Sequence, residues 1–180
     1  MDIQGDPVET PPTPPTTLPG LGEYGLEDLC MKDASGQCTK TLTGQTNEIK
    51  FSQAEGDFPM TFFINDVVFE PSCADVVTAQ LGSIDEWTLI NDSPYDHPFH
   101  IHVNPFQVIS VTGENLVEDT TLYRDPTYRD TIIVPRKVGT TKGQVVFRTL
   151  YKKWDGQAVF HCHILVHEDM GMMANFSIVQ

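Results

Sequence analysis

The chain has 180 residues, of which 39% are hydrophobic and 20% are charged, and its 25 acidic against 11 basic residues give a net charge of -14. The length suits one domain with a tail, or at most two small domains, and the composition is that of a globular protein. The negative charge excludes nucleic acid and anionic membrane surfaces as partners, because both would repel the chain. No apolar run approaches the ~18 residues of a membrane-spanning helix.

The first 47 residues are expected to be irregular. The opening stretch MDIQGDPVETPPTPP has neither a basic region nor an apolar run, so it is not a signal peptide as it stands. Residues 7–19 are rich in proline and threonine, which predicts a linker or an extended segment, because proline fixes φ and lacks a backbone N–H. Residues 20–47 are expected to form loops, with one short helical turn around residues 26–31.

The four cysteines bear on the origin of the chain. Without a signal peptide, the protein is either cytosolic or a piece of something longer. Cys30 and Cys38 have a spacing compatible with a local disulfide, which favours the second interpretation, although two free thiols fit this spacing equally well. Cys73 has no assigned role, and Cys162 lies between two histidines.

From about residue 48 the sequence changes to short β-prone runs separated by turns. These runs are EIKF (48–51), MTFFI (60–64), VVF (67–69) after an Asn65-Asp66 turn, DVVTAQL (75–81), EWTLIN (86–91), FQVISV (106–111), DTIIV (130–134), GQVVFRTL (143–150), QAVFHCH (157–163) and MMANFSIV (172–179). Strands of this length and spacing predict an all-β domain over residues 48–180, either a β-sandwich or a Greek-key barrel.

All six histidines fall in two short segments, 97-HPFHIH-102 and 161-HCHILVH-167. A lone histidine on a strand is usually a satisfied polar residue, but clustering of this kind needs another cause. Alternate side chains of a strand share a face, so His100 and His102 point one way, and His161 and His163 point together. Two such strands would present four imidazoles on one side, which suits a multinuclear metal site.

Cys162 points to the opposite face, where it is free to join His97 and His167. Two histidines, a thiolate and a weak axial ligand describe a blue-copper electron-transfer site, and Met172 is the natural axial candidate. Zinc is the competing metal, but a structural zinc site needs four strong ligands and commonly a Cys-x-x-Cys pair, which the sequence lacks. The tripeptide HCH would then give a short covalent path between two redox centres.

The segments HPFHIHVNPF and HCHILVHEDMGMM resemble copper-binding signatures of the multicopper oxidases, a family that includes laccases, bilirubin oxidases and bacterial spore-coat laccases. EWTLIN and YRDTIIVP also resemble the last cupredoxin domain of that family, so the resemblance covers about residues 48–180. It implies a cupredoxin-like Greek-key fold and an extracellular or periplasmic oxidoreductase. A phenol, an aromatic amine or a reduced metal ion would lose electrons at a blue copper, and a trinuclear copper cluster would reduce dioxygen to water.

The resemblance also implies which residue serves which copper. The type 1 copper would take His97, Cys162 and His167, with Met172 in the axial position. The trinuclear cluster would take the remaining imidazoles: His100 for the type 2 copper, and His102, His161 and His163 for the type 3 pair.

Two acidic residues have implied roles beside these ligands. Glu168 would be a catalytic acid that delivers protons near the dioxygen path, a plain surface acid being the alternative. Asp130 would accept a hydrogen bond from a ligand histidine, or would simply begin a strand.

The ligand set is incomplete, because the family's trinuclear cluster needs eight histidines and four of them come from an N-terminal cupredoxin domain. The chain is therefore interpreted as the C-terminal domain of a longer oxidase, or a truncated product of one, and is expected to be inactive alone. A partner chain that supplies the missing histidines is the alternative. A single-domain blue-copper electron carrier and a copper-free interaction domain are functions of other classes, but neither explains the four additional histidines.

Two further patterns carry less information. The stretch TGENLVEDTTLYRDPT (112–127) contains acidic residues that would bind cationic donors or metal ions, although a solvated loop is the favoured interpretation. Asn91-Asp92-Ser93 and Asn175-Phe176-Ser177 match the N-glycosylation pattern, but both lie in predicted strands, which argues against their use.

Overall fold

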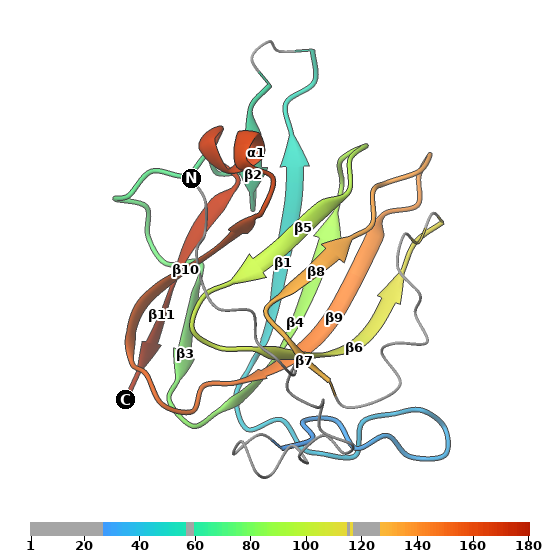
Figure 1. Cartoon of the computed structure of the whole chain (residues 1–180), viewed down its shortest axis with the longest axis vertical. Helices are drawn as coiled ribbons and strands as arrows, with labels where there is room; N and C mark the ends of the chain where they lie inside the picture. Colours follow the sequence, from blue (N-terminus) through green and yellow to red (C-terminus); the bar gives the residue numbers. More distant parts are fainter. Residues whose placement is uncertain (1–26, 57–59, 115, 117–126) are drawn as a thin grey trace, which may run out of the picture.

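The computed structural model describes residues 27–56, 60–114, 116 and 127–180 (Figure 1). The linker predicted at residues 7–19 and most of the stretch at 112–127 lie outside these residues. The described part of the chain forms eleven strands and one short helix, so the predicted all-β class is confirmed. None of its helical structure is long and apolar enough to cross a membrane.

The strands form two curled sheets that face each other (Figure 1). The first sheet, in the order β2-β1-β4-β9-β6-β7, consists of β1 (Thr46–Gln53), β2 (Phe62–Ile64), β4 (Ile84–Asn91), β6 (Phe106–Thr112), β7 (Tyr128–Arg129) and β9 (Gly143–Leu150). The second, in the order β3-β11-β10-β5-β8, consists of β3 (Val77–Gln80), β5 (His97–Ile101), β8 (Thr131–Val134), β10 (Gly156–Cys162) and β11 (Met173–Val179). Helix α1 (Leu165–Asp169) lies at one end of the sheets, beside β2.

Aromatic side chains fill the space between the two sheets. Burial alternates along β4 as the period-2 pattern requires, and Trp87 on this strand is fully buried. Its ring stacks on Phe147 of β9 at 5.7 Å and meets the edge of Phe160 of β10 at 5.3 Å. Because Phe160 directly precedes His161, this packing also fixes the strand that carries the second histidine motif.

The prediction of a strand at residues 67–69 is wrong. Asn65 and Asp66 adopt φ angles of 52° and 64°, which confirms the predicted turn at these two residues. After this turn, Val67 pairs with Ile64 only through an isolated bridge, and Val67 and Val68 stay exposed. Strand β7 and helix α1 were not predicted, because two and five residues are too few to show a period.

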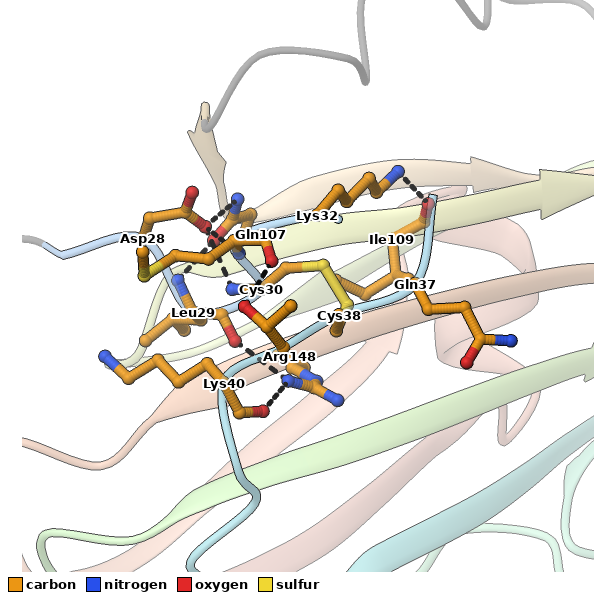
Figure 2. The surroundings of a disulfide bond; sticks show 12 residues. Asp28, Leu29, Cys30, Lys32, Gln37, Cys38, Lys40, Gln107, Ile109 and Arg148 are labelled. Atoms are coloured by element: carbon orange, nitrogen blue, oxygen red, sulfur yellow. Dashed lines mark hydrogen bonds between the residues drawn. A yellow bond between two sulfur atoms is a disulfide. The ribbon is translucent and has the colours of Figure 1, made fainter. Parts of the chain in front are cut away.

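Residues 27–40 form a loop that a disulfide between Cys30 and Cys38 closes (Figure 2). Of the two alternatives for these cysteines, the disulfide is the one found. The predicted helical turn is wrong over residues 27–31, its described part, because the Asp28 carboxylate caps the backbone instead. Asp28 Oδ1 accepts hydrogen bonds from the N–H groups of Cys30 at 2.9 Å and Met31 at 3.0 Å.

Long-range hydrogen bonds tie this loop to β6 and β9 of the first sheet. The N–H of Leu29 donates to Gln107 Oε1 at 2.7 Å, and Arg148 Nη1 donates to the carbonyl groups of Leu29 at 3.0 Å and Lys40 at 2.7 Å (Figure 2). Leu29 and Cys30 are buried. The loop therefore packs against the strands, and a domain boundary at residue 48 stays a prediction.

Candidate metal centres

The two histidine motifs lie on neighbouring strands of the second sheet. β10 pairs antiparallel with β5, so that His161 lies opposite His100 and Cys162 lies opposite Phe99. This register brings the motifs together, and the alternation of side chains then divides their ligand atoms between two groups. The predicted division between the faces of the strands is confirmed for His100, His102, His161 and Cys162.

The first group consists of His97, Cys162 and His167, which come from β5, β10 and α1. Cys162 Sγ lies 3.5 Å from His97 Nδ1 and 3.6 Å from His167 Nδ1, and the two nitrogens are 3.2 Å apart. The point equidistant from these three atoms is about 2 Å from each, close to the length of a bond between a metal ion and an imidazole nitrogen. The three side chains therefore fit one metal ion without rearrangement.

Burial tunes the first group for metal binding. Burial, together with the charge that a protonated His167 would place nearby, lowers the pKa of His97 to about 3. Burial also lowers the pKa of His167, so both rings are neutral and able to act as ligands at pH 7. Burial raises the pKa of the Cys162 thiol to about 11, so a metal ion that binds there must displace its proton. Two neutral imidazoles and one potential thiolate form a donor set that fits copper.

Aromatic rings enclose this group. The ring of Phe62 stacks on His167 with a centroid distance of 4.0 Å, and the ring of Phe51 stacks on His97 at 5.9 Å. Neither phenylalanine has exposed surface. The two rings limit the rotation of the imidazoles and keep water away from their ligand nitrogens.

Met172 is buried and connects directly to two residues of the first group through its backbone. Its carbonyl accepts the N–H of Cys162 at 3.0 Å, and its N–H donates to the carbonyl of His167 at 2.9 Å. Gly171 makes this return of the chain possible, because its φ is +103° and a Cβ atom there would lie 2.5 Å from Val68. The backbone thus places Met172 beside the first group.

The second group lies on the other side of β5 and β10. The ligand atoms of His100, His102 and His161 are all within 4.8 Å of one another, and Nε2 of His102 is 3.3 Å from Nε2 of His161. The ring of His163 lies 5.4 Å from the rings of His100 and His161. His102 and His163 are exposed, whereas His161 is buried.

Two histidines of the second group have partners at Nδ1, which leaves Nε2 available. His100 Nδ1 lies 2.9 Å from the backbone carbonyl of Asp130 and 3.0 Å from Thr131 Oγ1. Asp130 thus contacts this imidazole mainly through its main chain, since its carboxylate is 3.9 Å away. His161 Nδ1 lies 3.1 Å from the carbonyl of Cys162.

Glu168 contacts the second group from helix α1. Its Oε2 lies 3.1 Å from His161 Nδ1, and its side chain is partly buried. The residue before it, His167, belongs to the first group. Glu168 therefore links the two groups, in addition to the peptide bond between His161 and Cys162.

An open cleft of about 510 Å³ adjoins the second group, lined by His100, His102, Val103, Asn104 and Asp130 among others. Asn104 is 4% exposed, and its Nδ2 is buried without a hydrogen-bond partner among the described residues. Val103 has a φ of +74° and is 54% exposed, although β-branched residues rarely adopt positive φ. Neither residue could be predicted from the sequence, because an unpaired amide and a strained backbone have no local pattern.

Comparison with known proteins decides the family. The sequence profile of the family described as multicopper oxidase matches residues 42–180, which is more than half of the chain. The chain belongs to the multicopper oxidases. Both the predicted family and copper as its metal are thereby confirmed.

Several multicopper oxidases are similar to this chain in sequence or in fold. A bilirubin oxidase of Albifimbria verrucaria is 35% identical over 123 residues, which are 65% of this chain and 20% of that protein. A laccase of Bacillus stratosphericus is 30% identical over 169 residues, which are 86% of this chain and 30% of that laccase. A multicopper oxidase from Campylobacter jejuni, described as a metallo-oxidase, has a TM-score of 0.63 and 29% identity, covering 76% of this chain and 30% of its own.

These comparisons confirm the cupredoxin-like fold class and show that the chain is a module of the multicopper oxidase family. The chain spans only between a fifth and a third of the length of these three relatives. It therefore corresponds to one part of a multicopper oxidase.

Proposed function

We propose that this chain is the C-terminal, copper-binding module of a laccase-like oxidase, with the cupredoxin domain at residues 48–180. The observation that carries the proposal is the division of the metal-ligand atoms into two adjacent groups. His97, Cys162 and His167 form a closed, buried site, and their donor set supports a type 1 copper with Met172 as axial ligand. His100, His102, His161 and His163 form an open set, which supports half of a trinuclear cluster with one type 2 and two type 3 coppers.

Bound copper would supply one-electron oxidation of a donor at the first group and reduction of dioxygen to water at the second. The chain connects these two events through its backbone. Cys162 is flanked by His161 and His163, so a ligand of the first group is joined by peptide bonds to two ligands of the second. This connection is the shortest covalent path that a polypeptide offers between two metal sites.

Glu168 is proposed to act as the catalytic acid at the second group. Its carboxylate lies against His161 Nδ1, so it orients this ring with Nε2 toward the other imidazoles. In its protonated form it would also hold a proton beside the site where dioxygen is reduced. The contact with His161 supports the functional role over that of a plain surface acid.

The cleft beside His102 is proposed to receive an N-terminal cupredoxin domain, from the same longer chain or from a partner chain. That domain would bring the missing imidazoles to the exposed rings of His102 and His163. The limited length of the chain relative to its relatives supports the same arrangement.

Exposed apolar side chains near His167 support an aromatic donor. Leu165 and Val166 directly precede this histidine and are 68% and 56% exposed, and the partly exposed ring of Tyr95 lies 6.2 Å from its ring. Exposed apolar groups that gather beside one residue often mark a binding site. A phenol or an aromatic amine is favoured here over a metal ion, which needs charged or oxygen ligands.

The disulfide between Cys30 and Cys38 supports an extracellular or periplasmic location, because disulfides form and persist in oxidising compartments.

Two measurements test this function. Titration of the chain with Cu(II) should produce the intense absorption and the paramagnetic resonance spectrum of a blue copper, saturating at one equivalent for the first group. Oxygen consumption with a phenolic donor should be near zero for this chain alone and should appear when the N-terminal domain is present. Oxygen consumption by the isolated chain would overturn the assignment of His100, His102, His161 and His163 to a half-site.

A further inference from the structure

The two ring nitrogens of His97 have different surroundings. Nδ1 faces the sulfur of Cys162 at 3.5 Å and the ring of His167 at 3.2 Å. Nε2 lies 2.6 Å from Oγ of Ser93. Neither His97 nor Ser93 has any exposed surface, so water does not compete for this short contact.

The other hydrogen bonds of Ser93 leave its hydroxyl oxygen able to accept in this contact. A serine hydroxyl has one hydrogen and two lone pairs. Ser93 Oγ lies 3.2 Å from the carbonyl of Tyr95, which can only accept, so the hydroxyl hydrogen has an acceptor there. The N–H of Tyr95 donates to the same Oγ at 3.3 Å and occupies one lone pair. The second lone pair is then free to accept a hydrogen from Nε2 of His97.

Asn91 holds this turn in place. Its Oδ1 accepts the N–H of Ser93 at 2.9 Å, and its Nδ2 donates to the carbonyl of Tyr95 at 2.8 Å and that of Val134 at 3.1 Å. Asn91 is fully buried, and these bonds connect the end of β4 to β8. These bonds hold the backbone of the turn, and with it the side chain of Ser93, beside His97.

We propose that Ser93 is a positioning residue for the type 1 copper ligand His97. Its hydroxyl accepts the hydrogen of Nε2, which leaves the lone pair on Nδ1 and aims it at Cys162 and His167. This inference rests on the proposed function, because it assigns a role toward the copper that the first group would hold. An acceptor at the distal nitrogen sets the tautomer and the ring plane of a metal-binding histidine and raises its basicity.

The same hydrogen bonds exclude Asn91 as a glycosylation site. In the tripeptide Asn91-Asp92-Ser93, both the amide and the hydroxyl are buried and engaged. The sequence matches the modification pattern, but the structure uses these side chains to support His97.

The tautomer can be measured on the whole chain without copper. Imidazole nitrogen chemical shifts of the metal-free, ¹⁵N-labelled protein at neutral pH should show His97 with hydrogen on Nε2 and a lone pair on Nδ1. The opposite tautomer in the wild-type chain would overturn the inference. This readout does not depend on whether any variant folds.

Variants test the consequence for copper. Ser93→Ala should weaken Cu(II) binding, measured against a competing chelator, by about 10- to 100-fold and should shift the blue absorption band. Ser93→Thr keeps the hydroxyl and should restore much of the affinity. Ser83→Ala is the matched control, because Ser83 is also buried and its hydroxyl donates to the carboxylate of Asp85 at 3.1 Å rather than to a histidine. This variant should leave the copper affinity and the spectrum unchanged.

The outcomes separate this inference from the proposed function. If the wild-type chain forms no blue copper site, the proposed function fails, and the nitrogen shifts still decide the tautomer of His97. If the blue site forms but Ser93→Ala has wild-type affinity and spectrum, the role of Ser93 is wrong while the copper site stands.

Discussion

The two groups of metal-ligand side chains differ in how completely the chain encloses them. The first group, His97, Cys162 and His167, has ligand atoms 3.2 to 3.6 Å apart and lies under the rings of Phe51 and Phe62. The second group, His100, His102, His161 and His163, includes two exposed rings and adjoins an open cleft.

This difference shows which chemistry the chain can complete alone. The ligands of the first group come from three elements, and packing within the chain fixes all three. The second group comes from two neighbouring strands, β5 and β10, and from the residue that follows each of them. No described residue covers the exposed faces of His102 and His163. Under the proposed function, an electron-transfer site would be built within one domain, whereas a dioxygen site would be closed by another.

Replacement of Cys162 should have the largest effect. Cys162→Ser removes the thiolate donor of the first group, so the blue absorption band should disappear completely. Cys73→Ser is the control, because Cys73 is the other free thiol and lies outside both groups. A blue band that survives in Cys162→Ser would show that the thiolate is elsewhere.

Replacement of His102 should separate the two groups. His102→Ala leaves His97, Cys162 and His167 untouched, so the blue band should keep its position and intensity. Copper bound beyond the first equivalent should decrease, as measured by metal analysis after equilibrium dialysis, because the close pair of His102 and His161 is lost. A change in the blue band would mean that the groups are not independent.

The division into two groups could be predicted because it depends on local periodicity. His100 and His102 are two residues apart, as are His161 and His163, and a strand places such pairs on one face. The prediction of a strand at residues 67–69 was wrong because, after the turn at Asn65 and Asp66, Val67 pairs only through an isolated β-bridge to Ile64. Hydrophobic content alone does not reveal whether a neighbouring strand is available for pairing.

Contacts between distant parts of the sequence could not be predicted. The bond between Leu29 and Gln107 joins residues 78 positions apart, and no local pattern contains it. The role of Ser93 was hidden for another reason, because its tripeptide matches a modification pattern and its contact with His97 depends on a turn fixed by Asn91. Glu168 was recognised by family resemblance, but its contact with His161 follows from the geometry of α1.

Acid should destabilise the copper-free protein through the first group. Above pH 6.5 His97 is neutral in both the folded and the unfolded chain. As the pH falls below 6.5, the unfolded chain binds a proton at His97, whereas the folded chain, in which its pKa is lowered to about 3, does not. The free energy of unfolding should therefore decrease by about 1.4 kcal/mol per pH unit for this proton, and the lowered pKa of His167 acts in the same direction.

Urea denaturation at several pH values between 7 and 4 measures this effect. Carboxylates also titrate in this range, so the informative quantity is the difference between the wild type and His97→Gln, which should show a shallower pH dependence. Equal pH dependence in the two proteins would show that burial of His97 does not control its protonation.

Loss of the disulfide should have the smallest effect and should leave both groups intact. The loop at residues 27–40 lies at the end of the sheets away from α1 (Figure 1), and it holds β6 and β9 through Gln107 and Arg148. Replacing Cys30 and Cys38 by serine should lower the free energy of unfolding by about 2 to 3 kcal/mol, because the disulfide closes only a short loop.

Asp28→Asn, which weakens the cap of the same loop, should lower the free energy of unfolding by about 1 kcal/mol, as measured by urea denaturation. In both variants the blue band should be unchanged, since none of these residues contacts the histidines. A shifted band would mean that a structural change at this end of the sheets reaches the first group through the core.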